Sequence, residues 1–182
     1  TLSDEAVNLS GKLSAVVTAT DGDLDVASKS VSIGASISFK DDGPSVTDMT
    51  VNANGAVVTD ETNQLNTAVT GTASVFTGGT VTLGSDSGTT DVSLRIDTAN
   101  TGLYTTAGNH LITLVADGSN NNIVYGKYDT NNDGTPDTTA FTVSMTDAGV
   151  LTVTQAVALK HGDPTLSDEA VNLSGKLSAV VT

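Results

Sequence analysis

Residues 30–39 read SVSIGASISF, and this stretch decides the fold class. Apolar side chains alternate along it with serine or glycine: Val31, Ile33, Ala35, Ile37 and Phe39. A period of two is typical of a β-strand with one buried face and one wet face. The stretch therefore predicts a long strand, which we place at residues 29–40.

The same alternation recurs along the chain. It is found at 13–20, 92–96, 141–145 and 151–159, with Gln155 as the polar exception in the last of these. Threonine and valine suit pleated surfaces, and clusters of Gly, Asn and Asp separate the stretches, none of which shows a sustained helical period. We therefore predict an all-β fold, an antiparallel β-sandwich of immunoglobulin or cadherin type.

The composition excludes several classes of protein. The 182 residues carry 21 acidic and 7 basic groups, a net charge of −14, which is too few cations for a nucleic-acid-binding face. There is no cysteine for a disulfide scaffold or a thiolate metal site. No apolar run reaches the roughly 18 residues of a membrane span, and no signal-peptide pattern opens the sequence. A hydrophobic content of 37% favours a folded chain over a disordered one.

The two ends of the sequence are identical. Residues 1–18 and residues 165–182 both read TLSDEAVNLSGKLSAVVT, at an offset of 164 residues. This period exceeds the roughly 20–50 residues of solenoid repeats, so each unit would be domain-sized. We infer an excerpt from a tandem array of near-identical units. A duplicated cloning segment is the alternative interpretation.

The boundary between units is predicted near residues 43–47. There the long strand ends in Phe39-Lys40-Asp41-Asp42-Gly43-Pro44, in which the proline lacks a ladder donor and the glycine permits a bend. Residues 1–46 would be the carboxyl-terminal strands of one unit, ending in this Asp-Asp-Gly-Pro linker. Residues 47–182 would be the following unit, truncated before its last strands.

The truncated unit would lack strands that the first segment carries. Residues 1–44 could fill that position, within one chain or by strand swapping between chains. The two copies of Leu13-Ser14-Ala15-Val16-Val17 cannot occupy it at once.

Residues 129–137, DTNNDGTPD, match the front of a calcium loop. Oxygen ligands stand at loop positions 1, 3, 5 and 9, a bending glycine at 6 and a carbonyl at 7. Ala140 replaces the bidentate Glu of an EF-hand, and predicted strands rather than helices flank the loop. A metal-free hairpin turn is the alternative. The candidate ligands are Asp129, Asn131, Asp133, Thr135 and Asp137.

Asp21, Asp23 and Asp25 form a second candidate site, in the turn between the strands predicted at 13–20 and 29–40. Three carboxylates within five residues repel one another, and a bound cation would reverse that effect. A solvated polar turn, tolerable because of screening, is the alternative.

The linker pair Asp41 and Asp42 is the third candidate. By analogy with the mechanism of cadherin junctions, calcium bound there would stiffen the joint between units. A charged flexible hinge is the alternative. Other acidic pairs could approach the linker in a folded array: Asp60 and Glu61, or Asp4 and Glu5 with their copies Asp168 and Glu169.

The sequence favours a calcium-binding protein that is not an enzyme. It contains neither G-x-S-x-G nor H-E-x-x-H, and aromatic residues that could tune glycosidase carboxylates make up only 3%. His110 and His161 are the only imidazoles, too few for a zinc or copper site. Oxygen ligand sets select hard cations, Ca²⁺ before Mg²⁺.

Several runs resemble the large tandem repeats of type I-secreted RTX adhesins. Residues 19–25 (ATDGDLD), 31–34 (VSIG) and 39–45 (FKDDGPS) look like that family's aspartate loop, alternating strand and F-x-D-D-G-P ending. Residues 149–161 are similar as well. Leu24 departs from the pattern, because the family often has glycine there. The glycine-rich nonapeptide of RTX proteins is absent.

The resemblance implies a structural role in adhesion and biofilm formation, outside the cell at the surface of a Gram-negative bacterium. Such repeats form the extender stalk that projects a distal ligand-binding domain. Their partners are the adjacent repeat units of the same chain, and extracellular calcium folds and stiffens them. The alternative is a calcium-dependent adhesin module that grips a sugar or a surface. The available rings form no obvious platform for such a ligand: Phe76, Tyr104, Tyr125 and Tyr128.

Overall fold

The chain divides into two units. Unit 1 comprises residues 1–45 and 81–89, and unit 2 comprises residues 46–80 and 90–182. The computed structural model describes residues 5–52, 55–61, 69–74, 76–77, 79–162 and 169–182.

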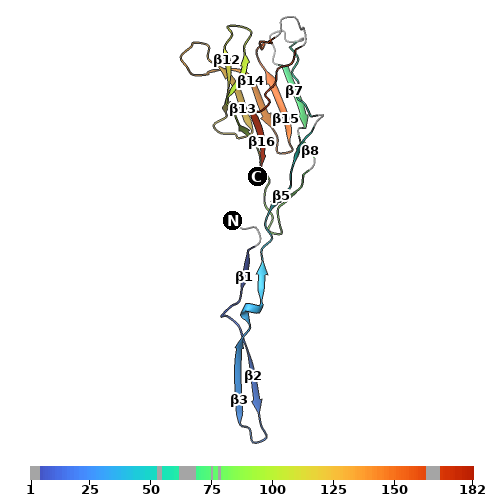
Figure 1. Cartoon of the computed structure of the whole chain (residues 1–182), viewed down its shortest axis with the longest axis vertical. Helices are drawn as coiled ribbons and strands as arrows, with labels where there is room; N and C mark the ends of the chain where they lie inside the picture. The colour runs from blue at the N-terminus through green and yellow to red at the C-terminus, as the bar shows by residue number, and fades with distance from the viewer. Residues whose placement is uncertain (1–4, 53–54, 62–68, 75, 78, 163–168) are drawn as a thin grey trace. The chain divides into compact units, whose positions relative to one another are not determined.

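Nearly all regular structure in both units is antiparallel β (Figure 1). The predicted all-β fold is therefore confirmed. Within the described residues no helix is long and apolar enough to cross a membrane.

Unit 1 is built on a hairpin. Strands β2 (Ser14–Thr20) and β3 (Val26–Ser32) pair without interruption from Ser14–Ser32 to Thr20–Val26. Strand β1 (Ala6–Asn8) pairs with β4 (Ser38–Lys40). A short ladder joins β5 (Ser45–Val46) to β9 (Val81–Thr82), and the Ser45 and Thr82 hydroxyls lie 2.5 Å apart.

The single strand predicted at 29–40 is wrong, because a 3-10 turn, η1 (Gly34–Ser36), separates β3 from β4. The turn follows from a close contact with the segment after β1. A Cβ on Gly34 would lie 1.7 Å from the carbonyl oxygen of Leu9, so only glycine fits at this point. The alternating stretch therefore changes partner, from β2 before the turn to β1 after it.

Unit 1 leaves much of the apolar face of this stretch in solvent, and only Ile33 and Ile37 are half-buried. Val31 and Phe39 are 62% and 56% exposed, and Val16 and Val17 on β2 are 64% and 72% exposed. The expectation that one face of the alternating strand is buried is thus met only in part in unit 1.

Unit 2 is organised around a six-stranded sheet, counted over the described residues. From β11 to β15 neighbouring strands follow one another in the chain, and β7 closes the far edge. The sheet order is β11 (Asn100–Tyr104), β12 (Leu111–Ala116), β13 (Ile123–Tyr128), β14 (Thr138–Met145), β15 (Val150–Gln155) and β7 (Val69–Ser74).

A second layer packs on this sheet. Strands β10 (Val92–Ile96) and β16 (Leu177–Val181) pair from Val92–Val181 to Ile96–Leu177. Leu94, Ile96 and Leu177 pack against the core. Its fully buried side chains come from β12, β13 and β14: Ile112, Leu114, Val124, Ala140, Phe141 and Val143. The two layers form the predicted sandwich, and the part of the chain that the structure describes gives its second sheet two strands.

Two smaller features complete unit 2. Strands β6 (Thr50–Val51) and β8 (Phe76–Thr77) form a short ladder. The strand predicted at 151–159 is too long, because β15 ends at Gln155. Beyond that residue the Ala156 N–H donates to the Ala140 carbonyl at 2.8 Å, and Leu159 forms an isolated bridge with Thr105.

Candidate metal centre

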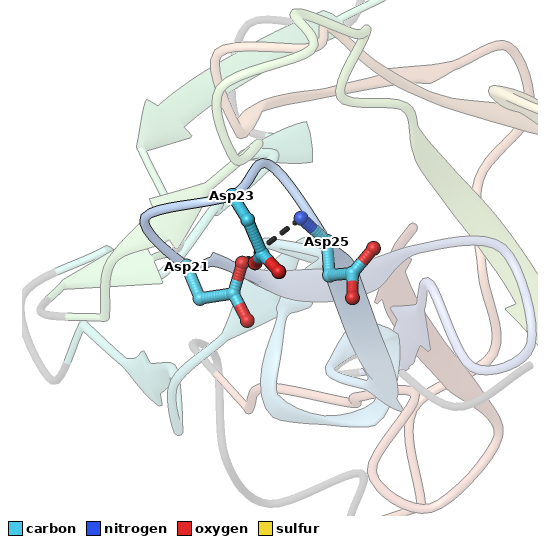
Figure 2. A group of neighbouring side chains, drawn as sticks. All are labelled: Asp21, Asp23 and Asp25. Atoms are coloured by element: carbon cyan, nitrogen blue, oxygen red, sulfur yellow. Dashed lines mark hydrogen bonds between the residues drawn. The ribbon is translucent and has the colours of Figure 1, made fainter.

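The carboxylates of Asp21, Asp23 and Asp25 come together in the turn between β2 and β3. One oxygen of each lies within 4.8 Å of the others, and all three residues are exposed. In the described part of the chain, no other three acidic, histidine or cysteine side chains approach so closely. Figure 2 shows the Asp23 side chain reaching across the turn toward Asp21. The turn therefore offers several hard oxygen ligands to one accessible cation.

The turn is held by its own hydrogen bonds. The Asp25 N–H donates to Asp21 Oδ1 at 2.9 Å, drawn in Figure 2, and the Asp21 N–H donates to the Asp25 carbonyl at 3.1 Å. Leu24 adopts a φ of 77°, a left-handed conformation that costs a residue with a Cβ. The RTX adhesin repeats that this sequence resembles often have glycine at this position, and Leu24 has a backbone conformation that favours glycine.

The electrostatics of the turn favour ionised Asp21. Hydrogen bonding with the Asp23 side chain is the main cause that lowers the pKa of Asp21, followed by hydrogen bonding with the Asp25 backbone. The ionised carboxylates repel one another through screening solvent. A divalent cation between them would replace this repulsion with attraction.

Asp129 organises the loop between β13 and β14. Its Oδ1 accepts the Asn131 N–H at 3.2 Å, and its Oδ2 accepts the Gly134 N–H at 2.7 Å. Asn131 Oδ1 and Asp133 Oδ1 accept the N–H groups of Asp133 and Thr135 at 3.0 and 2.8 Å. Gly134 has a φ of 91°, so the predicted bend at this glycine is confirmed.

The carboxylates of this loop do not converge on one point. Asp137 Oδ1 accepts the hydroxyls of Thr138 and Thr130 at 2.9 and 3.3 Å. The Thr138 bond is the first cause of a lowered pKa of Asp137. Among the described residues, the carboxylate oxygens of Asp129, Asp133 and Asp137 do not all lie within 4.8 Å of one another. Calcium binding at 129–137 stays a prediction.

The acids predicted at the unit junction lie in separate units. In unit 1, Asp41 Oδ1 accepts the Asp42 N–H at 3.0 Å, and Asp42 Oδ2 accepts the Ser85 hydroxyl at 3.2 Å. Asp60 and Glu61 belong to unit 2. The pairs at 4–5 and 168–169 each include a residue outside the described part of the chain. Junctional calcium stays a prediction.

Glu61 is part of a polar anchor inside unit 2. Its Oε1 accepts the Gln155 side-chain amide at 2.5 Å and the Leu159 N–H at 2.8 Å. Gln155 is only 2% exposed and also accepts the Thr59 hydroxyl at 2.6 Å. The sequence reasoning did not predict this anchor. The single polar residue in an apolar alternation was the signal that could have located it.

A second set of contacts that the sequence did not predict surrounds Asp117. Its Oδ1 accepts the N–H groups of Ser119 and Asn120 at 2.8 and 2.9 Å, and its Oδ2 accepts the Tyr125 hydroxyl at 2.8 Å. The Ser119 bond is the largest cause of a lowered pKa of Asp117, followed by the Tyr125 bond. The same carboxylate raises the pKa of Tyr125.

A known protein family matches most of the chain. Residues 56–182 match a family described as a domain of unknown function, DUF5801. The chain belongs to the DUF5801 family. No match was found among curated proteins or among solved structures. The DUF5801 region contains the six-stranded sheet, the β10–β16 pair and the 129–137 loop, and the Asp21, Asp23 and Asp25 cluster precedes it.

Proposed function

We propose that the chain is a calcium-rigidified structural extender module of an extracellular bacterial adhesin of the RTX type. In this role it spaces a distal ligand-binding domain from the cell surface. The observation that carries the proposal is the approach of the Asp21, Asp23 and Asp25 carboxylates to within 4.8 Å. The identity of residues 1–18 and 165–182 supports a spacer, because length is what repetition supplies most directly.

Calcium would act by coupling ion binding to folding. The chain has a net charge of −14, and its tightest acidic cluster lies in the turn that joins the paired strands β2 and β3. An ion that binds the folded turn and not the unfolded chain stabilises the fold by mass action. At a hundredfold excess over its Kd, calcium should raise the unfolding midpoint by roughly 10 °C.

A sugar-binding module is the less supported function. It would use aromatic rings beside the 129–137 loop, where Tyr125 and Tyr128 lie. The Tyr125 hydroxyl already donates to Asp117 at 2.8 Å, and the Tyr128 ring lies 5.7 Å from the ring of His110. These rings have structural partners.

The test is thermal unfolding of the full chain in EDTA, in millimolar Ca²⁺ and in millimolar Mg²⁺. We expect a rise of roughly 10 °C with Ca²⁺ and a smaller one with Mg²⁺. Asp23→Asn should remove most of the calcium-dependent rise. Asp86→Asn, which also removes one exposed acid from unit 1, should retain it.

Two results would overturn the proposal. One is an unfolding midpoint that is the same in EDTA and in Ca²⁺. The other is an equal loss of the calcium effect in Asp23→Asn and Asp86→Asn, which would mean general screening of negative charge and no specific site.

A further inference from the structure

Two asparagines in the chain stand in the acceptor sequence of N-linked glycosylation. Asn8 is followed by a leucine and Ser10, and Asn172 is followed by a leucine and Ser174. The pattern is N-x-S with a residue other than proline in the middle. None of the other asparagines in the sequence has serine or threonine two positions later. Because a three-residue pattern also occurs by chance, what distinguishes these two sites is their geometry.

The acceptor sequence leads into a tight turn that holds the serine at its corner. In the first copy the Lys12 N–H donates to the Leu9 carbonyl at 2.9 Å, and Gly11 has a φ of 71°. A positive φ at the third of four turn residues is typical of a type II turn, in which Ser10 is the second residue. The second copy repeats this geometry at residues 173–176, with a bond of 3.0 Å and a glycine φ of 69°.

Each asparagine is oriented through its side-chain oxygen, which leaves its nitrogen free. Asn8 Oδ1 accepts the Ser10 N–H at 2.9 Å, and Asn172 Oδ1 accepts the Ser174 N–H at 3.0 Å. Among the described residues neither Nδ2 group has a hydrogen-bond partner. All four residues are exposed. The nitrogen that would carry a sugar and the serine that completes the pattern are therefore both accessible.

This arrangement is set locally. In the first copy the strand after the turn is β2, paired with β3, and in the second copy it is β16, paired with β10. The turn and the asparagine contact are nevertheless the same in both copies. The presentation of the asparagine therefore does not depend on the partner of the following strand.

Three other exposed asparagines give an internal comparison. The Oδ1 atoms of Asn100, Asn120 and Asn131 accept the N–H two residues later at 2.9, 2.9 and 3.0 Å. The residues that donate are glycine, asparagine and aspartate, so no hydroxyl is present at that position. These three comparison asparagines share the local turn and lack only the serine or threonine of the acceptor pattern.

We propose that Asn8 and Asn172 are acceptor sites for N-linked glycosylation by a transferase that uses a nucleotide-activated hexose. In the transfer, Nδ2 forms a bond to the anomeric carbon of the hexose as the bond from that carbon to the phosphate oxygen breaks. The nucleoside diphosphate leaves with the electron pair, and the Nδ2 proton passes to a base of the transferase. The attached sugar adds a bulky, hydrophilic group to the surface. The proposal depends neither on metal binding nor on the extender role.

The test is incubation of the folded full chain with a soluble N-glycosyltransferase and UDP-glucose, followed by trypsin digestion and mass spectrometry. Trypsin cleaves after lysine, so the two sites lie in separate peptides, residues 1–12 and 161–176. We expect one hexose on each of these peptides and none on the three comparison asparagines. No hexose on either peptide, while a synthetic N-x-S peptide in the same reaction is modified, would overturn the proposal. Modification that appears only after the chain is unfolded would overturn it too.

Substitutions test whether the hydroxyl is read. Ser10→Ala should lower modification of Asn8 by at least about tenfold and leave Asn172 unchanged, and Ser10→Thr should restore it. Asp133→Ser gives Asn131 the missing hydroxyl and frees its Nδ2 from the Asp133 carboxylate, 3.1 Å away, so Asn131 should become an acceptor. Equal modification of Asn8 in Ser10→Ala and in wild type would contradict the assignment.

Discussion

Gly126 on β13 lies directly opposite Phe141 on β14, and a Cβ at position 126 would lie 2.3 Å from the tip of the Phe141 ring. Phe141 is 3% exposed and sits in the core, so the ring cannot move out of the way without disturbing the second layer. We predict that Gly126→Ala lowers the free energy of unfolding of unit 2 by about 1–3 kcal/mol in urea.

The control for this change is Gly118→Ala, because a Cβ at Gly118 meets no atom within 4 Å. It should leave stability within about 0.5 kcal/mol of wild type. If both variants unfold at the same urea concentration, the Phe141 ring does not exclude a Cβ at position 126, and the prediction is wrong.

Replacement of Leu24 by glycine should stabilise the turn at residues 21–25. Its φ of 77° is unfavourable for a side chain with a Cβ, and the side chain itself is 78% exposed. Leu24→Gly should tighten the turn and slow hydrogen exchange of the Asp25 amide, which donates to Asp21, by about threefold to tenfold. Leu24→Ala keeps the unfavourable φ and should show no such protection.

The Asp117–Tyr125 contact should stabilise unit 2 across the neutral range. The pKa of Asp117 is lowered from 3.8, so this contribution is lost as the pH falls through the lower folded value. The pKa of Tyr125 is raised from 10.0, so the contribution is lost at the other end as the pH rises through the higher folded value. Tyr125→Phe should therefore lower the Tm by a few degrees between about pH 5 and pH 9.

The pH dependence is the decisive readout for Tyr125→Phe. The difference in Tm between wild type and variant should shrink below pH 3.8 and above pH 10.0. A difference that stays constant from pH 3 to pH 11 would show that the hydroxyl acts through packing alone.

Asp129→Ala should loosen the 129–137 loop whether or not calcium is present. The substitution removes the acceptor of the Asn131 and Gly134 N–H groups, and exchange of the Gly134 amide should rise by about tenfold. Asp137→Ala is the comparison, because the Asp137 carboxylate accepts the Thr130 and Thr138 hydroxyls. It should leave the Gly134 amide protected, and equal exchange in the two variants would contradict the role of Asp129.

Alternation alone located β10, β14 and β15 of unit 2, because there the pattern coincides with packing. Val92–Ile96 forms β10, and the side chains of Phe141 and Val143 point into the core, as period-two reasoning expects. The break at Gly34 could not be foreseen from local pattern. It depends on contact with Leu9, which is distant in sequence.

The candidate site was predictable to the extent that it is local. Asp21, Asp23 and Asp25 lie in one five-residue turn, so pairing of the flanking strands brings them together. At 129–137 calcium binding stays a prediction, and the Thr130 and Thr138 hydroxyls donate to the Asp137 carboxylate there. The contacts of Gln155 were not predicted, because its partners Thr59 and Glu61 come from a segment that is distant in sequence.

The duplicated eighteen residues give the molecule a built-in reference for the effect of environment on a fixed sequence. Gly11 and Gly175 have φ values of 71° and 69°, so spectroscopic signals of the two turns should nearly coincide. Signals of Val17 and Val181 should differ, because one side chain is in solvent and the other is half-buried. The difference in methyl chemical shift between these two valine side chains reports, within a single sample, what tertiary packing adds when intrinsic strand preference is held constant.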